Sequence, residues 1–500
     1  MAPPSRWLLL LTIAVVALFT VLRFWLASTL DLRTDEAYYW TWARQWVPGY
    51  LDHPPMVAWF VKLGQLIFGD TTLGARFGQI LALPVIEFFL ADIARRRTRS
   101  WNAALFVVIA LECTLYYSLV VIVLEPSIPM LLFVSIVLWS LSRLDESMDG
   151  RWWLLAGAAG GLALLSKLLV FLVAPAILVF LLSVRHRRWV ATRWPWLGLV
   201  IAVLICLPFL VWNARHGWPT FTFQTDRLGT GGALSSYELI KFVVFDTVCA
   251  GLLLVPLSFV QGIRLAVRSF GRNWPFEATM ATTFLVPIIL FLIRSLNTLI
   301  LQSWAYYAWP IGVVCLALSL NWAKRWIGAK VILGLVFVPG VLWVSALFYH
   351  GIWDRNVWLR GGDPFGQDSG YAEVAKDAVK VAKANGALWI ATTDYRTYAN
   401  LYWHIRDAMP IVQVSQRSRY LDFTPVDPAQ YRGRALYVHE QSAPMQMDDA
   451  DRTPLETLHT KYRGRPMRDI AVELLDNYTA DLNPAPEAPR SKASQLDWWN

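Results

Sequence analysis

The stretch WLLLLTIAVVALFTVLRFWLASTL (7–30), followed at once by DLRTDEAYYW (31–40), decides how this chain is built. The first segment is long and apolar enough to cross a bilayer, which takes about 20 residues. The second segment places the carboxylates of Asp35 and Glu36 where the chain leaves the membrane, among aromatic residues such as Tyr38. This arrangement predicts an enzyme whose active groups face a membrane surface.

The composition extends this prediction to the whole chain. Of its 500 residues, 56% are hydrophobic and 16% are charged, whereas soluble proteins have about 25% charged residues. Apolar stretches of spanning length recur, and we expect about eleven membrane-spanning helices. They are predicted at 7–28, 74–94, 101–118, 120–141, 152–166, 168–184, 194–212, 241–262, 277–294, 298–319 and 329–349. The predicted fold class is a polytopic α-helical membrane protein.

Positive charges indicate how these helices are oriented. Cytoplasmic loops carry an excess of Lys and Arg, and clusters such as Arg95 to Arg97 and Arg264 to Arg272 fall in alternate loops. With a cytoplasmic N-terminus, residues 31–73 form the first outer loop and everything after about residue 350 lies in the periplasm. Most of the net charge of +9 follows from this topology, and it gives no sign of nucleic-acid binding.

A change in composition after His350 predicts the domain organisation. We expect a transmembrane catalytic domain at 1–350, a soluble periplasmic α/β domain at 351–480 and a disordered tail at 481–500. Alternating segments in the soluble domain favour a largely parallel sheet. The helical patterns lie at 370–384 and 394–406, and the strand-like runs lie at 387–393, 409–414 and 434–439.

Asp35 is the candidate general base. A carboxylate held between aromatic rings at a bilayer edge loses hydration, and burial raises its affinity for a proton. A base within hydrogen-bond reach of that proton contributes roughly 10²–10⁴-fold to a rate. Glu36 and Tyr38 are expected to support this site. The alternative is that Asp31, Asp35 and Glu36 only solvate the loop or cap a helix that begins near residue 35.

Cations near the predicted outer boundary of the membrane are candidates for binding a phosphate. His53 precedes Pro54 and Pro55, which restrict the backbone and present the imidazole in a fixed direction. The other candidates are Lys167, Arg215 and Arg227. The alternatives are a packing role for His53 and snorkelling of the other three side chains at the ends of helices.

Acidic residues within the apolar stretches predict a polar cavity, because ionisable groups are costly in a membrane. The residues are Glu87, Glu112, Glu125 and Asp246, and all but Glu87 lie toward the outer half of the membrane. We assign Glu125 a supporting role in the site. The histidines show no metal-binding spacing, and the four cysteines all fall inside predicted spans. We therefore expect no metal ion and no other cofactor.

Four segments resemble a known family in order and approximate spacing. They are DEAYYWTWAR (35–44), GYLDHPPM (49–56), GLALLSK (161–167) and LPFLVWNARHGWPTFTFQ (207–224). They resemble bacterial membrane glycosyltransferases of the GT-C superfamily. The relatives within it are the protein mannosyltransferase-like group and the aminoarabinose and galacturonic acid transferases that modify lipid A or the lipopolysaccharide core. The resemblance covers roughly the first 360 residues.

The resemblance implies a fold, a reaction and roles for some residues. It implies a polyprenyl-phosphate-linked sugar as donor, a hydroxyl outside the inner membrane as acceptor, and inversion at the anomeric carbon. The catalytic base of the family corresponds to Asp35, and a position near the donor phosphate corresponds to His53. One departure concerns a family Asp, since this chain reads Glu125, Pro126, Ser127 there. Because a helix turns about 200° over two residues, we expect Glu125 to face elsewhere.

The predicted function is an inverting transfer of a sugar to a cell-envelope acceptor, with lipid A or lipopolysaccharide core favoured. An alternative acceptor is a protein, as for protein O-mannosyltransferases. Alternatives of other classes are a lipid-linked sugar transporter or flippase and an inactive scaffold. The chain lacks the paired, interrupted spans that inverted-repeat transporters contain, which disfavours the transporter.

Overall fold

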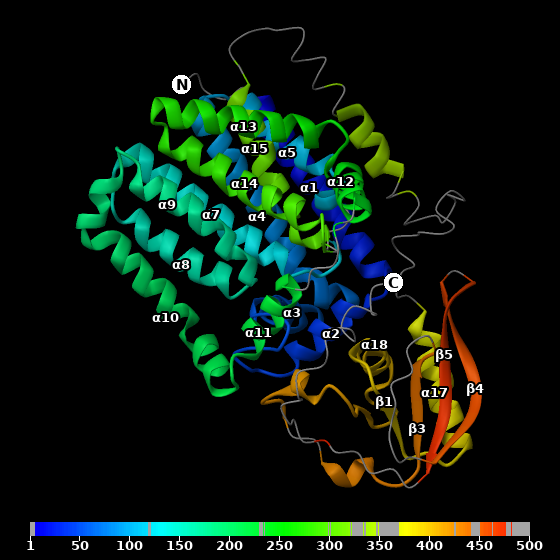
Figure 1. Cartoon of the computed structure of the whole chain (residues 1–500). Coiled ribbons are helices and arrows are strands. Elements are labelled where there is room, and N and C mark those ends of the chain that lie inside the picture. The colour runs from blue at the N-terminus through cyan, green and yellow to red at the C-terminus, as the bar shows by residue number, and fades with distance from the viewer. Residues whose placement is uncertain are drawn as a thin grey trace. The chain divides into compact units, whose positions relative to one another are not determined.

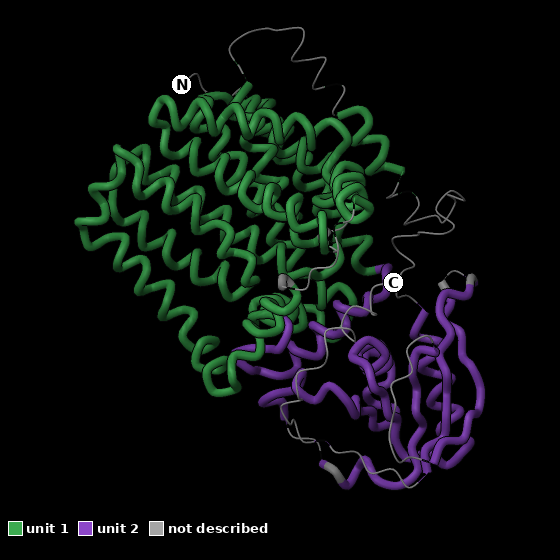
Figure 2. Tube along the Cα trace, viewed as in Figure 1, with its two compact units in different colours: residues 1–28, 53–355 green, residues 29–52, 356–500 purple. Residues whose placement is uncertain are grey.

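The computed structural model divides the chain into two compact units (Figure 2). The helical unit comprises residues 1–28 and 53–355, and the sheet unit comprises residues 29–52 and 356–500. The structure describes residues 6–118, 122–229, 234, 236–298, 300, 302–320, 322, 334, 337–346, 349, 370–424, 427–441, 451–462, 464–476 and 482. The predicted boundary at 350–351 and the predicted tail, apart from Leu482, lie outside the described residues.

The domain limits drawn from sequence stay a prediction, but one grouping differs from them. Residues 29–52, most of which belong to the first outer loop predicted at 31–73, group with the C-terminal part of the chain. Their helix, α2 (Thr34–Ala43), packs on α18 (Tyr395–Ile405) of the same unit. The ring of Trp40 lies 4.9 Å from that of Trp403 in an edge-to-face arrangement. No sequence pattern predicts this contact between distant parts of the chain.

The helical unit is built from apolar helices joined by short connections (Figure 1). Its described helices are α1 (Arg6–Thr29), α3 (Met56–Phe68), α4 (Thr72–Thr98), α5 (Trp101–Glu112), α6 (Leu115–Ser118), α7 (Ser127–Ser147), α8 (Trp152–Leu164), η2 (Leu168–Val173), α9 (Ala174–Leu182), η3 (Arg187–Ala191), α10 (Arg193–Arg215), α11 (Pro219–Gly229), α12 (Ser236–Ala250), α13 (Leu254–Arg272), α14 (Pro275–Arg294), η4 (Gln302–Trp304) and α15 (Ala308–Ser319).

Several of these helices can span a membrane, as predicted. Among the described residues, α1, α4, α7, α10 and α14 are each long and apolar enough, and α12 with α13 forms a sixth candidate. This pair corrects the single span expected at 241–262, because the two helices meet at a bend of 99°. The chain turns there at Gly251, whose φ of +104° favours glycine. The total of about eleven spans stays a prediction.

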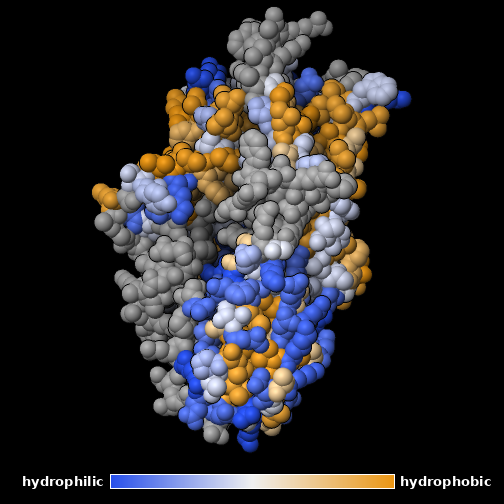
Figure 3. All heavy atoms as spheres, turned by 90° about the vertical axis from the view of Figure 1, so that its right-hand side faces the viewer, coloured by the Kyte–Doolittle hydropathy of each residue, from blue (hydrophilic) through white to orange (hydrophobic). Residues whose placement is uncertain are grey.

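Exposed apolar side chains show which surfaces suit a lipid environment. Trp7, Leu66, Leu182 and Val267 are all more than half exposed on helices of the helical unit. On the face shown in Figure 3, orange apolar residues form patches on the surface of the helical unit. A soluble protein rarely exposes such extensive apolar surface, so these faces fit contact with hydrocarbon.

Close helix contacts in this unit depend on small residues. Helices α8 and α10 approach each other at Gly157 and Gly198, where a Cβ on Gly157 would lie 2.0 Å from the carbonyl oxygen of Gly198. A backbone this close leaves no room for any side chain. Small residues at such crossings are typical of helices packed within membranes.

The sheet unit contains one five-stranded sheet in the order β2-β1-β3-β5-β4. Its strands are β1 (Trp389–Thr392), β2 (Ile411–Gln413), β3 (Ala435–Glu440), β4 (Asp451–Tyr462) and β5 (Arg465–Asp476). The other described elements are α2, α17 (Tyr371–Ala384), α18, η6 (Arg417–Tyr420) and η7 (Pro428–Tyr431). Strand β1 is parallel to β2 and β3, whereas β5 is antiparallel to β3 and β4.

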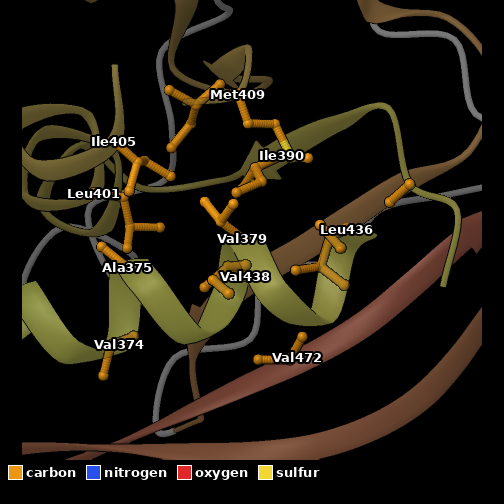
Figure 4. Packing of buried hydrophobic residues seen from close by; sticks show 14 of the residues in the cluster. Val374, Ala375, Val379, Ile390, Leu401, Ile405, Met409, Leu436, Val438 and Val472 are labelled. Atoms are coloured by element: carbon orange, nitrogen blue, oxygen red, sulfur yellow. The ribbon is translucent and has the colours of Figure 1, made fainter. Parts of the chain in front are cut away.

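The helices and strands expected up to residue 439 are confirmed, but the sheet is mixed rather than largely parallel. Strands β4 and β5 form an antiparallel hairpin that the sequence does not signal, because charged residues interrupt their apolar alternation. Figure 4 shows how α17 is held on the sheet: Val379 faces Ile390 and Val438 across the core. Burying each such side chain contributes roughly 1.5–3 kcal/mol.

Candidate active site

The predicted cations of the helical unit meet around a turn before α3. His53 lies in this turn and is buried. The backbone N–H of Met56 donates to the carbonyl of Leu165 at 3.0 Å, which fixes the turn against the end of α8. The amide nitrogen of Gln224, on α11, lies 3.5 Å from Nδ1 of His53. Because that nitrogen donates, Nδ1 accepts and Nε2 carries the proton of a neutral imidazole.

Lys167 is buried between α8 and η2, where the backbone is extended. Its Nζ lies 2.9 Å from Oε1 of Glu125 and 2.7 Å from Oγ of Ser127. The expectation that Glu125 faces elsewhere is therefore wrong. Helix α7 begins only at Ser127, so the helical rotation does not apply to Glu125, and both side chains reach the same ammonium group.

Arg227 joins this group from the last turn of α11. Its guanidinium lies 5.6 Å from the ring centre of Trp304, a distance typical of a cation–π contact. The adjacent carbonyl of Ser303 accepts a hydrogen bond from Oγ of Ser127 at 2.9 Å. The neighbouring residues Ser303 and Trp304 thus contact Ser127, which binds Lys167, and Arg227.

The electrostatics show that His53, Lys167 and Arg227 are close neighbours; we call them the cationic cluster. Burial lowers the pKa of His53 well below its usual range, and the charges of Lys167 and Arg227 lower it further. The imidazole is therefore neutral at pH 7. Lys167 pairs with Glu125, and the two cationic side chains beside a neutral imidazole are groups suited to bind a phosphate.

Arg215 does not take part in this arrangement. Its side chain is exposed at the last turn of α10. Within the part of the chain that the structure describes, no hydrogen bond, ion pair or ring contact connects it to the cationic cluster. Its position at a helix end fits the snorkelling alternative.

The predicted acidic pair separates into two different environments in the sheet unit. Glu36 is fully buried, and its Oε2 accepts a hydrogen bond from the backbone N–H of Arg33 at 2.9 Å. The capping role suggested by spacing thus falls on Glu36. Asp35 is exposed, which corrects the expectation that burial among aromatic rings removes its hydration. An exposed carboxylate is accessible to a substrate.

Asp35 is bordered by an aromatic and cationic group that the sequence did not reveal. The hydroxyl of Tyr395 donates to Oδ1 of Asp35 at 3.3 Å. The ring of Tyr395 lies 4.8 Å from that of Tyr38. The guanidinium of Arg419 lies 4.4 Å from the ring centre of Tyr395, and it binds the carboxylate of Asp52 at 2.6 and 2.8 Å.

Neither Tyr395 nor Arg419 could be found from the sequence, because each lies more than 350 residues from the segment that it contacts. Tyr395 lies three residues after the end of β1, and Arg419 belongs to the polar run QRSRY (416–420), which carries no motif. Among the described residues, no three His, Cys, Asp or Glu side chains are grouped for a metal ion. The absence of a cofactor stays a prediction.

Two comparisons with known proteins define the class of this chain. Residues 52–212 match the family model of dolichyl-phosphate-mannose-protein mannosyltransferases. The crystal structure of ArnT from Cupriavidus metallidurans, bound to undecaprenyl phosphate, superposes with a TM-score of 0.63 at 17% identity, covering 94% of this chain and 98% of ArnT. The fold is thus that of ArnT, and the resemblance to GT-C membrane glycosyltransferases is confirmed.

Particular relatives narrow this class further. The lipid A galacturonosyltransferase RgtD of Rhizobium johnstonii is 25% identical over 399 residues, which are 76% of this chain and 78% of RgtD. The undecaprenyl phosphate-alpha-4-amino-4-deoxy-L-arabinose arabinosyl transferase of Yersinia enterocolitica is 26% identical over 383 residues, 68% of this chain and 67% of the relative. The chain is similar to both, and it is a multi-pass membrane glycosyltransferase.

Proposed function

We propose that this chain is an inverting glycosyltransferase that moves a sugar from a polyprenyl-phosphate donor to a hydroxyl of lipid A or of the lipopolysaccharide core. One observation carries the proposal: His53, Lys167 and Arg227 come together from three separate segments, with Glu125 paired to Lys167. Such a cluster suits a phosphate at a membrane. The names of the relatives, which include a lipid A transferase and undecaprenyl-phosphate sugar transferases, support the donor and acceptor.

In the proposed reaction the acceptor oxygen displaces the phosphate directly. The oxygen forms a bond to the anomeric carbon on the face opposite to the phosphate, so the configuration inverts. The bond between that carbon and the phosphate oxygen breaks, and its electron pair leaves with the polyprenyl phosphate. Lys167 and Arg227 stabilise the charge that develops on this phosphate, and Nε2–H of neutral His53 donates a hydrogen bond to it.

Asp35 accepts the proton of the acceptor hydroxyl as the new bond forms. Its exposure leaves the carboxylate accessible, and the hydroxyl of Tyr395 orients it. Asp52 and His53 are consecutive in the sequence, so the segment that carries the base continues directly into the residue proposed for the phosphate. Phosphate is a good leaving group when its charge is neutralised, and the scheme requires no metal ion.

We place the reaction at the periplasmic side of the inner membrane, with the sheet unit in the periplasm. The alternation of positive charges along the chain supports this orientation. The polyprenyl chain of the donor and the acyl chains of lipid A would both remain in the bilayer, which brings the two reacting groups to the same membrane surface.

The test is transfer of radiolabelled sugar from a panel of polyprenyl-phosphate sugars, in membranes that contain either the native chain or Asp35→Asn. We expect label in the lipid A or core fraction with the native chain and none with the variant. Label in the protein fraction would instead identify a protein O-glycosyltransferase. No transfer from any donor would contradict the proposal and favour a transporter or a scaffold.

A further inference from the structure

The carboxyl ends of neighbouring parallel strands in the sheet unit carry the residues that border Asp35. Strand β1 ends at Thr392, and Tyr395 opens α18 three residues later. Strand β2 ends at Gln413, and Arg419 follows in η6. In open α/β sheets, functional groups gather at this edge because parallel strands bring their following loops together.

These two residues contact both ends of the segment 29–52. At one end, Nη1 of Arg419 donates to both carboxylate oxygens of Asp52, at 2.6 and 2.8 Å, and lies 3.3 Å from the hydroxyl of Tyr38. At the other end, Tyr395 donates to Asp35 at 3.3 Å. Because the guanidinium of Arg419 stacks on the ring of Tyr395, the contacts form one continuous group.

Packing of α2 on α18 supports these contacts. Nδ2 of Asn400, on α18, donates to Oγ1 of Thr34, the first residue of α2, at 3.0 Å. Thr424 donates to the side chain of Gln45 through both its backbone N–H and its hydroxyl, at 3.0 and 2.9 Å. The segment 29–52 is therefore attached along its length to the C-terminal residues and not only at Asp52.

The charge states suit a holding role. Burial raises the pKa of Tyr38 and of Tyr395, so both hydroxyls keep their protons and remain hydrogen-bond donors at every physiological pH. The groups that act on Tyr395 are Asp35, Arg396, Arg419 and Asp52. Arg419 thus neutralises Asp52 while it faces the tyrosine that donates to Asp35.

We infer that Arg419 and Tyr395 are positioning residues for Asp35, and that the C-terminal residues are a working part of the catalytic apparatus rather than an accessory domain. This inference rests on the proposed function, in which Asp35 is the base. Arg419 acts through Asp52, Tyr38 and Tyr395, and Tyr395 acts by orienting the carboxylate and by stabilising its charged form.

The test compares transfer kinetics of the full-length chain, purified in detergent, with those of Arg419→Gln and Tyr395→Phe. We expect Arg419→Gln to lower kcat about 10- to 100-fold, the loss typical of a misplaced reacting group. The KM for the donor should change less than threefold, since the cationic cluster is untouched. Tyr395→Phe should move the acid limb of the kcat/KM profile to higher pH, because a hydrogen bond to a carboxylate favours its ionised form.

Arg434→Gln is the matched control. Arg434 forms an arginine–aspartate pair with Asp476 at 2.6 Å, in the same unit but at the start of β3. We expect it to retain native kcat and the native pH profile. Native kinetics in a folded Arg419→Gln chain would overturn the inference, as would an unchanged acid limb in Tyr395→Phe.

The design separates this inference from the proposed function. If the native chain transfers sugar and Asp35→Asn does not, the proposed function holds whatever the Arg419 variant does. If Arg419→Gln fails to fold, Tyr395→Phe decides, because it removes only a hydroxyl. A single cysteine at Val47, which is buried in the segment 29–52, gives an independent readout, since all four native cysteines are buried as well. Arg419→Gln should accelerate its labelling by maleimide, and an unchanged rate would contradict a positioning role.

Discussion

At the scale of single residues, the proposed chemistry divides between a base and a phosphate site. The cationic cluster lies wholly within the helical unit, and Asp35 lies within the sheet unit. Variants in the two groups should therefore have different kinetic signatures. Loss of a contact to the donor phosphate raises KM, whereas loss of the base lowers kcat.

Lys167→Met should weaken donor binding. A hydrogen bond to a charged group contributes about 1.5–3 kcal/mol, so we expect the KM for the donor to rise roughly 10- to 100-fold. Isothermal titration with polyprenyl phosphate measures this loss directly. Lys241→Met is the control, since Lys241 is an exposed lysine near Glu238 on α12. Equal affinity of Lys167→Met and the native chain would exclude Lys167 as a phosphate ligand.

His53 should make stability depend on pH. Its folded pKa is lowered, so below about pH 6.5 the unfolded chain binds a proton that the folded chain does not. The contribution of His53 to stability is therefore complete above this pH and decreases as the pH falls. We expect thermal unfolding in detergent to show a smaller loss between pH 7.5 and 5.5 for His53→Gln than for the native chain.

The control for this measurement is His459→Gln, which replaces a half-exposed histidine on β4. It should leave the pH dependence of the unfolding temperature unchanged. A native pH dependence in His53→Gln would show that the imidazole is not held neutral by its surroundings.

At the scale of elements, backbone proximity sets the packing of α8 on α10. A Cβ at Gly157 would lie 2.0 Å from a carbonyl oxygen, whereas a Cβ at Gly160, one turn later on the same helix, would meet nothing within 4 Å. Gly157→Ala should lower the unfolding temperature, with a destabilisation of about 1–3 kcal/mol typical of overpacking. Gly160→Ala should leave it unchanged or slightly raised. Equal effects of the two would contradict this packing.

The elements also show what the sequence can and cannot predict. Spans such as α4 and α14 are predictable because a run of about 20 apolar residues has few possible structures other than a membrane-spanning helix. The strands β4 and β5 are not, since their apolar alternation is interrupted by charges such as Arg452 and Asp469 and only pairing reveals it. The bend between α12 and α13 likewise escapes a hydropathy pattern that is continuous across it.

The same limit applies to the site. A motif predicts that His53 and Asp35 are important, but the pairing of Lys167 with Glu125 depends on where α7 begins, a matter of two residues. Arg419 could not be predicted at all, because its contact with Asp52 joins residues 367 positions apart. Tertiary contacts of this length leave no local pattern.

At the scale of the whole molecule, the account requires the sheet unit to be periplasmic. Cysteine labelling tests this orientation, since all four native cysteines are buried. A cysteine at Met467, on β5, should react with a membrane-impermeant maleimide in cells with a permeabilised outer membrane. A cysteine at Arg188, in the basic connection between α9 and α10, should react only after lysis. The reverse pattern would contradict the orientation.

The measurement that tests the central claim most directly is a paired assay of sugar transfer and polyprenyl-phosphate binding for the native chain, Asp35→Asn and Glu36→Gln. We predict that Asp35→Asn binds the lipid with native affinity but transfers sugar about 10²- to 10⁴-fold more slowly, the contribution of a general base. Glu36→Gln, which alters only the buried cap of α2, should lose stability more than turnover. Transfer at the native rate by Asp35→Asn would contradict the assignment of Asp35 as the base.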